Sequence, residues 1–308
     1  MPGILIKDID SMKRTIGIIE LFITAIIWGT AFVAQSMGMD QGVGPCTFNG
    51  VRYAVGSIVL IPVIFLLGKL VKKEASEKPD TVITVKGGIF CGIVLAAASL
   101  LQQFGILYTT VGKAGFGTAL YIIIVPFMGV ILKKRIPGRV WIAAVIAIVG
   151  FYLMCISETL SINKGDLLVL LGAVMWSVHI HTVDHFAPRA NGVMLSSIQF
   201  AVSSCICFIG AFLFETVSWN TIAGAAGPIL YAGIMSCGVA YTLQIIGQQN
   251  VEPALACLIM SLESVVSALA GWVILGETMA FVEIVGCALV FAGVIIAQLP
   301  DKRVVSGV

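Results

Sequence analysis

The sequence predicts an all-α polytopic membrane protein, and three features support this fold class. Hydrophobic residues make up 59% of the 308 positions, charged residues make up only 11%, and the mean hydropathy is +1.05. A soluble domain carries roughly 25% charged residues. The apolar residues also gather in runs of about 20, the length that an α-helix needs to cross a bilayer.

Ten such runs follow one another, and each predicts one transmembrane helix. They cover residues 16–38, 46–68, 86–107, 114–132, 139–157, 165–186, 192–214, 225–247, 253–275 and 279–299. The links between them leave no room for a soluble domain. The longest link, from Lys69 to Lys86, contains KKEASEKPD and is expected to be a solvated cytoplasmic loop.

The basic residues predict the orientation, because cytoplasmic loops carry an excess of Lys and Arg. With the N-terminus in the cytoplasm, the outer segments hold only Lys113 and Lys164. The inner segments then hold fifteen basic residues: Lys7, Lys13, Arg14, Lys69, Lys72, Lys73, Lys78, Lys86, Lys133, Lys134, Arg135, Arg139, Arg189, Lys302 and Arg303. This bias places both termini in the cytoplasm and favours an even number of spans.

The two halves of the chain, residues 16–157 and 165–299, show a weak internal repeat. The segments AIIWG, RYAVGS and LQQFG of the first half correspond, in the same order, to AVMWS, QFAVSS and LQIIG of the second. Because each half holds five helices, an odd number, the second half must enter the membrane in the opposite orientation. The sequence therefore predicts ten transmembrane helices in two inverted five-helix repeats, with a shared site near the midplane between them.

Several motifs resemble a known family. WGTAFVAQ, LQQFGILYTT, TALYIIIVP, YTLQIIGQ and SLESVVSALAGWVILGE are similar to the ten-helix members of the drug/metabolite transporter superfamily, the EamA family. The resemblance covers about residues 16–299. It implies a basket-shaped bundle with a central cavity, and outward movement of small metabolites, often amino acids or similar compounds. Family members often have proline after the glutamate in the ninth helix, where this chain has Ser264, so no proline-induced break is expected there.

Glu263 is the leading functional candidate because it lies near the middle of the apolar run from Pro253 to Glu277. An unpaired carboxylate at that depth costs several kcal/mol or takes up a proton, so such groups indicate proton or ion sites by default. The structural alternative is a carboxyl group bonded to the hydroxyl groups of Ser261 and Ser264. The aligned residue of the first half is Val125, so the charge belongs to only one repeat.

Arg52 is the basic residue that lies well inside a span, about six residues from its outer end. A functional Arg52 would bind a solute carboxylate through two parallel hydrogen bonds. A structural Arg52 would reach the interface or pair with a carbonyl, and Asn49 and Tyr53 could complete a hydrogen-bonded corner. The structural role is the favoured one.

Amides and aromatic residues inside the apolar runs are further candidates. They are Gln102, Gln103, Gln199, Gln244, Tyr121 and Tyr241. Buried amides need partners, so they are expected to face the bundle interior, where the partner is a solute or another helix. Trp28 and Trp176 hold matching positions about twelve residues into their spans, which favours cavity walls over an interfacial belt.

The helix at 165–186 carries a group of histidines. His181, Asp184 and His185 share one face, a spacing that metal sites use. They approach the cytoplasmic end of the helix, where a polar side chain loses little hydration, so no metal site is expected. His179 lies deeper and is a candidate for the cavity or for a proton relay.

These observations predict a secondary transporter, expected to export small polar metabolites such as amino acids or related compounds across the cytoplasmic membrane, with protons as the candidate coupling ion. One arginine inside the bundle is too few for phosphate-bearing solutes, which need several basic groups. The alternatives are a multidrug or cation–proton antiporter and, less favoured, a membrane-embedded enzyme or a sensor. The sequence lacks a Walker A motif, so ATP is not expected to drive transport directly.

We expect the partners to be the lipid bilayer, a small-molecule substrate and protons, and we expect neither a cofactor nor nucleic acid. Three histidines are too few for a diiron enzyme, and no nucleophile and base lie at matched depth. The chain is expected to be a monomer or a homodimer.

Overall fold

The computed structural model of this protein describes residues 2–71, 79–108, 111–155, 164–275 and 280–298. Within these ranges the chain consists of helices joined by turns and short links, and contains no strand. The elements are α1 (Pro2–Asp40), α2 (Pro45–Val71), α3 (Thr81–Ile106), α4 (Val111–Ala119), α5 (Tyr121–Ile131), α6 (Gly138–Cys155), α7 (Lys164–Phe186), η1 (Ala187–Arg189), α8 (Gly192–Phe214), α9 (Trp219–Gly224), α10 (Ala226–Leu230), η2 (Tyr231–Tyr241), α11 (Thr242–Gln248), α12 (Pro253–Met260), α13 (Leu262–Leu275) and α14 (Phe281–Gln298).

The prediction of an all-helical polytopic membrane protein is confirmed. Within the described residues, seven helices are long and apolar enough to cross a membrane. The other three predicted spans correspond to the shorter apolar helices Gly117–Ile131, Gly138–Gly150 and Ile284–Ala297. The total of ten spans therefore stays a prediction.

Some helices begin before the predicted apolar runs, because polar residues continue the helix or cap its first turn. Helix α1 begins at Pro2, well before the apolar run, because backbone hydrogen bonding continues into its polar N-terminal part. Helix α3 begins at Thr81, where the Asp80 side chain accepts hydrogen bonds from the first free N–H groups. The short helix α9 was not predicted. The basic residues Lys72, Lys73, Lys78, Lys302 and Arg303 and the carboxylate Glu277 lie outside the described residues.

Apolar side chains cover the outside of the bundle and polar side chains lie inside it. Large exposed hydrophobic residues include Phe65, Phe212 and Val273, whereas Gln103 and Gln199 are fully buried. A membrane explains this distribution, because lipid solvates the apolar surface while polar groups find partners inside the protein.

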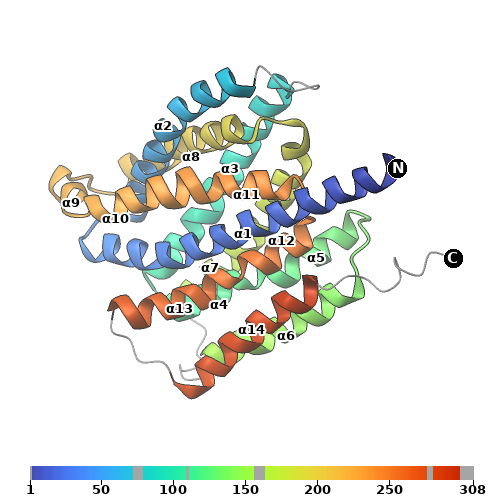
Figure 1. Cartoon of the computed structure of the whole chain (residues 1–308). Helices are drawn as coiled ribbons and strands as arrows, with labels where there is room; N and C mark the ends of the chain where they lie inside the picture. The colour runs from blue at the N-terminus through green and yellow to red at the C-terminus, as the bar shows by residue number, and fades with distance from the viewer. Residues whose placement is uncertain (1, 72–78, 109–110, 156–163, 276–279, 299–308) are drawn as a thin grey trace.

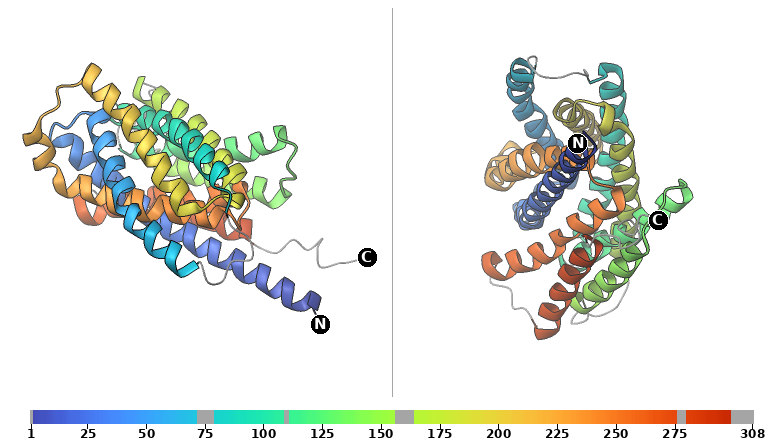
Figure 2. Two further views of the ribbon diagram at one scale, coloured as in Figure 1. Left: turned by 90° about the horizontal axis from the view of Figure 1, so that it is seen from above. Right: turned by 45° about the vertical axis from the view of Figure 1, so that its right-hand side comes forward.

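The two halves of the chain are interleaved rather than placed side by side. Helix α2 packs on α8, α3 packs on α7 and α8, and α6 packs on α14. Helix α1 crosses the middle of the bundle and contacts η2, α11 and α13 (Figure 1). In both Figure 1 and the right panel of Figure 2, α2 lies at one end of the bundle and the α6–α14 pair lies at the other. Every span of the first half therefore has second-half neighbours.

A carboxylate at one end of the bundle connects the halves. Glu215, directly after α8, accepts hydrogen bonds from the backbone N–H groups of Cys46 at 2.7 Å and Thr47 at 2.8 Å, and from the Thr47 hydroxyl group at 2.8 Å. These N–H groups belong to the first turn of α2, which has no intrahelical partners for them and favours negative charge. Glu215 thus caps α2 and fixes it against α8.

Replacing Glu215 by alanine should destabilise the protein. The variant loses charge-assisted hydrogen bonds to a helix end, a loss of about 1–3 kcal/mol in the free energy of unfolding. Thermal unfolding in detergent should show a lower melting temperature. Glu252→Ala is the matched control, because Glu252 directly precedes α12 but makes no capping hydrogen bond. Equal melting temperatures for the two variants would contradict the capping role.

Candidate functional site

Two helical segments at the centre of the bundle are each interrupted by a one-residue turn. The first turn, at Leu120, lies between α4 and α5, and the second, at Ser261, lies between α12 and α13. Both residues keep right-handed helical backbone angles, so the chain tightens there without unwinding. The turn at Ser261 comes before Glu263 and involves no proline. At Ser261 the hydroxyl group bonds to the carbonyl oxygen of Leu258 at 2.8 Å, and this competition with the backbone ladder accompanies a tightened turn.

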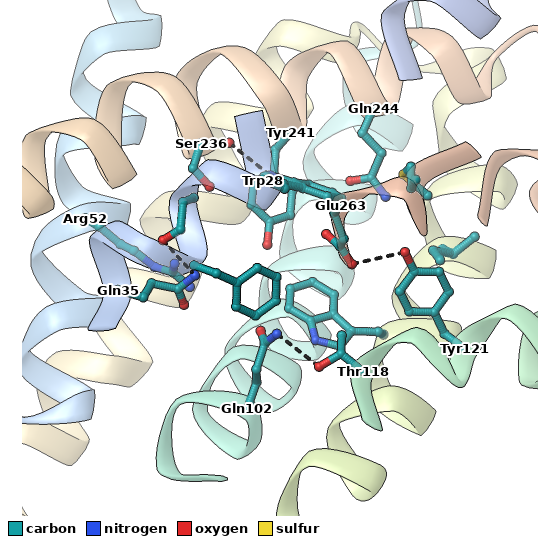
Figure 3. Close-up of a pocket in the computed structure, with 15 residues that line it drawn as sticks. Trp28, Gln35, Arg52, Gln102, Thr118, Tyr121, Ser236, Tyr241, Gln244 and Glu263 are labelled. Carbon is teal, nitrogen blue, oxygen red and sulfur yellow. Dashed lines mark hydrogen bonds between the residues drawn. The ribbon is translucent and has the colours of Figure 1, made fainter. Parts of the chain in front are cut away.

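The interruptions bring Glu263 and Tyr121 together. Glu263 lies in the first turn of α13, and Tyr121 is the first residue of α5. The Tyr121 hydroxyl group donates a hydrogen bond to Glu263 Oε1 at 3.1 Å (Figure 3). The Ser264 hydroxyl group bonds across the same junction to the carbonyl oxygen of Gly115 at 3.4 Å. The carboxyl group is therefore held by the first half of the chain and faces the dipole of its own helix.

A third irregular segment, the π-helix η2, lies opposite. Its wider turns leave carbonyl groups that accept side-chain hydrogen bonds, a feature that often marks functional sites. The Trp28 indole N–H donates to the carbonyl oxygen of Ser236 at 3.4 Å, and the Thr24 hydroxyl group donates to that of Ala240 at 3.0 Å. Helix α1 is thereby fixed to η2, and the ring of Tyr241 packs 4.6 Å from that of Trp28.

A cavity lies between these segments. Its volume of about 40 Å³ is enough for about three water molecules. Its lining comes from both halves of the chain. The lining residues are Trp28, Ala31, Phe32, Gln35, Arg52, Gln102, Thr118, Tyr121, Trp176, Ile180, Ser236, Tyr241, Gln244, Met260 and Glu263.

The two ends of the cavity differ in charge. Figure 3 shows Arg52 and Gln35 on one side, and Glu263 with Tyr121 on the other. Trp28 and Tyr241 lie between them. An acidic side chain and a basic side chain thus lie at opposite ends of the cavity, with a wall of aromatic side chains between them.

Several polar atoms of the lining have no hydrogen-bond partner among the described residues. They are Gln35 Oε1, Arg52 Nε, Trp176 Nε1 and Gln244 Oε1. Unpaired buried atoms also occur outside the lining, for example in Gln103 and Gln248. Those of the lining lie beside an open volume, where a polar solute or water could supply the missing partners.

Eight of the eleven residues proposed from the sequence line the cavity. They are Trp28, Arg52, Gln102, Tyr121, Trp176, Tyr241, Gln244 and Glu263. Gln103, Gln199 and His179 are buried but do not line it. Helix geometry explains Gln103, because neighbouring residues on a helix point about 100° apart and Gln102 faces the cavity. His179 lies behind the wall, where its Nε2 donates to Gln199 Oε1 at 3.1 Å and its ring meets Trp176 and Tyr241 edge-on.

Two hydrogen-bond arrangements that were considered as structural alternatives have different partners in the structure. Ser261 and Ser264 bond to backbone carbonyl groups, and the Glu263 carboxyl group bonds to Tyr121 instead. Asn49 donates to the carbonyl oxygen of Ser99 at 3.4 Å, so it does not complete a corner with Arg52. The expected Tyr53 contact is present, because Arg52 Nη2 donates to the Tyr53 hydroxyl group at 3.0 Å.

The polar residues near the end of α7 make contacts between segments. His181 Nε2 donates to the carbonyl oxygen of Val125 at 2.9 Å, and Asp184 forms an ion pair with Lys134. His185 packs edge-on against the ring of Phe186. These side chains thus have partners from the chain itself, most of them on the segment from α5 to α6.

The sequence reasoning missed three polar residues of the lining, Gln35, Thr118 and Ser236. Gln35 was detectable, since it lies seven residues after Trp28 and therefore on the same helix face. Thr118 accepts a hydrogen bond from Gln102 Nε2 at 3.2 Å, a contact that depends on how α4 folds back on α3. Ser236 reaches the site because η2 is a π-helix, and no sequence pattern signalled that.

An apolar helical bundle around a cavity lined by aromatic, polar and charged side chains is the architecture of a membrane transport protein. The chain belongs to the EamA-like transporter family, whose profile matches residues 15–156 and again residues 163–298. The family resemblance predicted from the motifs is thus confirmed.

Relatives and a solved structure extend this finding. An "uncharacterized transporter" of Archaeoglobus fulgidus is 27% identical over 94% of this chain and 88% of its own length. The "uncharacterized transporter YwfM" of Bacillus subtilis is 25% identical over 95% of this chain and 97% of its own. A crystal structure with 20% identity aligns with 96% of this chain and 99% of its own at a TM-score of 0.77, which shows a shared fold.

Gly29 should be needed to keep Glu263 in place. A Cβ atom there would lie 2.6 Å from the carbonyl oxygen of Glu263 and 2.5 Å from Val266 Cβ, so Gly29→Ala must push α13 away from α1. Such overpacking costs typically about 1–3 kcal/mol. We expect a lower melting temperature and reduced solute flux. Gly227→Ala, where a Cβ meets nothing within 4 Å, is the control, and equal behaviour of the two variants would contradict the prediction.

Proposed function

We propose that this protein is a secondary transporter that exchanges protons for small polar metabolites, such as amino acids or related compounds, across the cytoplasmic membrane. The observation that carries the proposal is the position of Glu263, a buried carboxyl group that lines a cavity between spans from both halves of the chain. Ionisable residues inside membrane-spanning bundles are rare and mark substrate or ion pathways and proton relays.

The contacts of Glu263 suggest how a proton and a solute could be coupled. The Tyr121 hydroxyl group is the hydrogen-bond partner of the carboxyl group, and both side chains line the cavity. A protonated Glu263 is neutral and tolerates burial, whereas a charged Glu263 needs a cationic group nearby. A solute amino group and a proton would therefore compete for the same site, which is the basis of exchange.

The orientation and the direction of transport are parts of this proposal. With both termini in the cytoplasm and a proton gradient directed inward, exchange moves the solute outward. The interleaved pairing of α2 with α8 and of α6 with α14 supports two inverted repeats, residues 16–157 and 165–299, because a two-fold axis would pair equivalent spans in this way.

The aromatic wall favours a second candidate, a cation–proton antiporter. Trp28, Trp176 and Tyr241 line the cavity together with the carboxyl group of Glu263, and aromatic rings can bind organic cations. Arg52 in the same cavity argues against a solute with only positive charge.

Glu263→Gln should abolish flux driven by a pH gradient without unfolding the protein. The amide has nearly the same shape but cannot exchange a proton. The measurement is uptake of radiolabelled amino acids and of the cation tetraphenylphosphonium into proteoliposomes with and without a pH gradient. A wild-type protein that moves only the cation would favour the antiporter.

Glu252→Gln serves as the matched control, because Glu252 is exposed and lies outside the cavity. It should transport like the wild-type protein. Unchanged flux by Glu263→Gln at every pH would refute the coupling role. Absence of flux of every solute in the wild-type protein would refute the transport proposal for this panel.

A further inference from the structure

We infer that Arg52 binds the carboxylate of the transported solute, so that a zwitterion lies in the cavity with its acidic group toward Arg52 and its amino group toward Glu263. This inference rests on the proposed function and adds a binding role for Arg52 and an orientation for the substrate.

The first argument is a buried charge without a counter-ion. The Arg52 side chain is only 3% exposed, and no carboxylate of the described residues lies within ion-pair distance of it. Its Nη2 donates to the Tyr53 hydroxyl group, while its Nε has no partner in the described part of the chain. A buried cation pays a large desolvation penalty unless an anion or several acceptors compensate it.

The protein supplies only part of that compensation. The guanidinium carbon lies 4.8 Å from the ring centroid of Tyr53 and 5.9 Å from that of Phe48. Ring faces attract the cation but accept few of the five N–H bonds that a guanidinium group can donate. Asn49, which was expected to help, donates to Ser99 instead. Arg52 therefore still has N–H donors that a solute in the cavity could bind through its acceptor oxygens.

The second argument is the position of Arg52 in the cavity. Arg52 lies on the side that Gln35 also lines, away from Glu263 (Figure 3). The backbone of Arg52 is fixed by close packing, since a Cβ atom on Gly233 of η2 would lie 3.0 Å from the Arg52 carbonyl oxygen. A guanidinium group held in this way can offer a carboxylate two parallel hydrogen bonds.

The charge balance selects the solute class. Arg52 is the one basic residue among the lining residues of the described cavity, and Glu263 is the one acidic residue. A solute with one carboxylate and one amino group neutralises both, whereas a phosphate ester would bring more negative charge than one arginine matches. The structure therefore favours a monocarboxylic zwitterion.

The test is a thermal-shift binding assay on purified protein with matched probes. The panel contains the twenty L-amino acids, their carboxamides, their N-acetyl derivatives and simple monocarboxylates. For the wild-type protein, amino acids that bind should bind at least about 30-fold more tightly than their carboxamides, because the amide leaves a buried charge unpaired. We call the affinity for the amino acid divided by that for its carboxamide the acid-to-amide ratio. In Arg52→Gln this ratio should fall to about 1. In Arg52→Lys, which keeps the charge but not the paired donors, the ratio should be intermediate.

The stability of the variants without ligand distinguishes a binding role of Arg52 from a structural role. If Arg52 awaits a ligand, Arg52→Gln should be no less stable than the wild-type protein, because a buried charge without a counter-ion has been removed. Arg189→Gln, at an exposed arginine outside the cavity, should keep both the stability and the ratio of the wild-type protein. If Arg52→Gln does not fold, the ratio measured for Arg52→Lys decides.

The outcomes that contradict this inference differ from those that contradict the proposed function. An acid-to-amide ratio that is unchanged in the Arg52 variants, or a wild-type protein that binds no carboxylate of the panel, overturns the role of Arg52. A protein that binds amino acids through Arg52 but moves none of them in the flux assay overturns the transport proposal alone.

Discussion

The need to give every polar group a partner inside a lipid-facing bundle is the constraint on which this structure depends. Outside, Phe65 and Phe212 contact an apolar solvent, so the usual hydrophobic driving force between helices is absent. Inside, most amides and hydroxyl groups are satisfied by one another, while Arg52 has no counter-ion among the described residues. Close contacts such as that of Gly29 with α13, and hydrogen bonds such as those of Glu215, therefore hold the helices together.

The same constraint explains why the irregular segments meet at the cavity. A regular helix satisfies its own backbone, and irregular backbone at membrane depth is tolerated only inside protein or beside a polar cavity. The turns at Leu120 and Ser261 and the π-helix η2 all border the cavity or its lining residues. There the carbonyl groups of Gly115, Ser236 and Ala240 receive side-chain donors. The local departures from helix geometry and the polar interior therefore depend on each other.

Helices α2 and α8 hold corresponding sequence segments of the two halves and pack on each other, yet the charges of the cavity are unequal. Arg52 belongs to the first half, and the corresponding segment of the second half has Gln199, which faces His179 behind the wall. Glu263 belongs to the second half, and Tyr121 of the first half is its hydrogen-bond partner. A scaffold with similar halves thus holds a cavity with distinct ends, which a solute with distinct ends can match.

The sequence by itself determined the membrane fold class, the family and eight of the cavity residues. Hydropathy can be read from a short segment, and a polar residue within an apolar span must face the interior of the bundle. It identified Glu263, Arg52 and the tryptophans for that reason. It did not determine which face each residue uses, so Gln102 and Gln103 were proposed together although only Gln102 lines the cavity. The tertiary structure alone decided the partners, since the contacts of Glu263 with Tyr121 and of Asn49 with Ser99 join segments far apart in the chain. It also decided the π-helix η2, which no sequence pattern signalled.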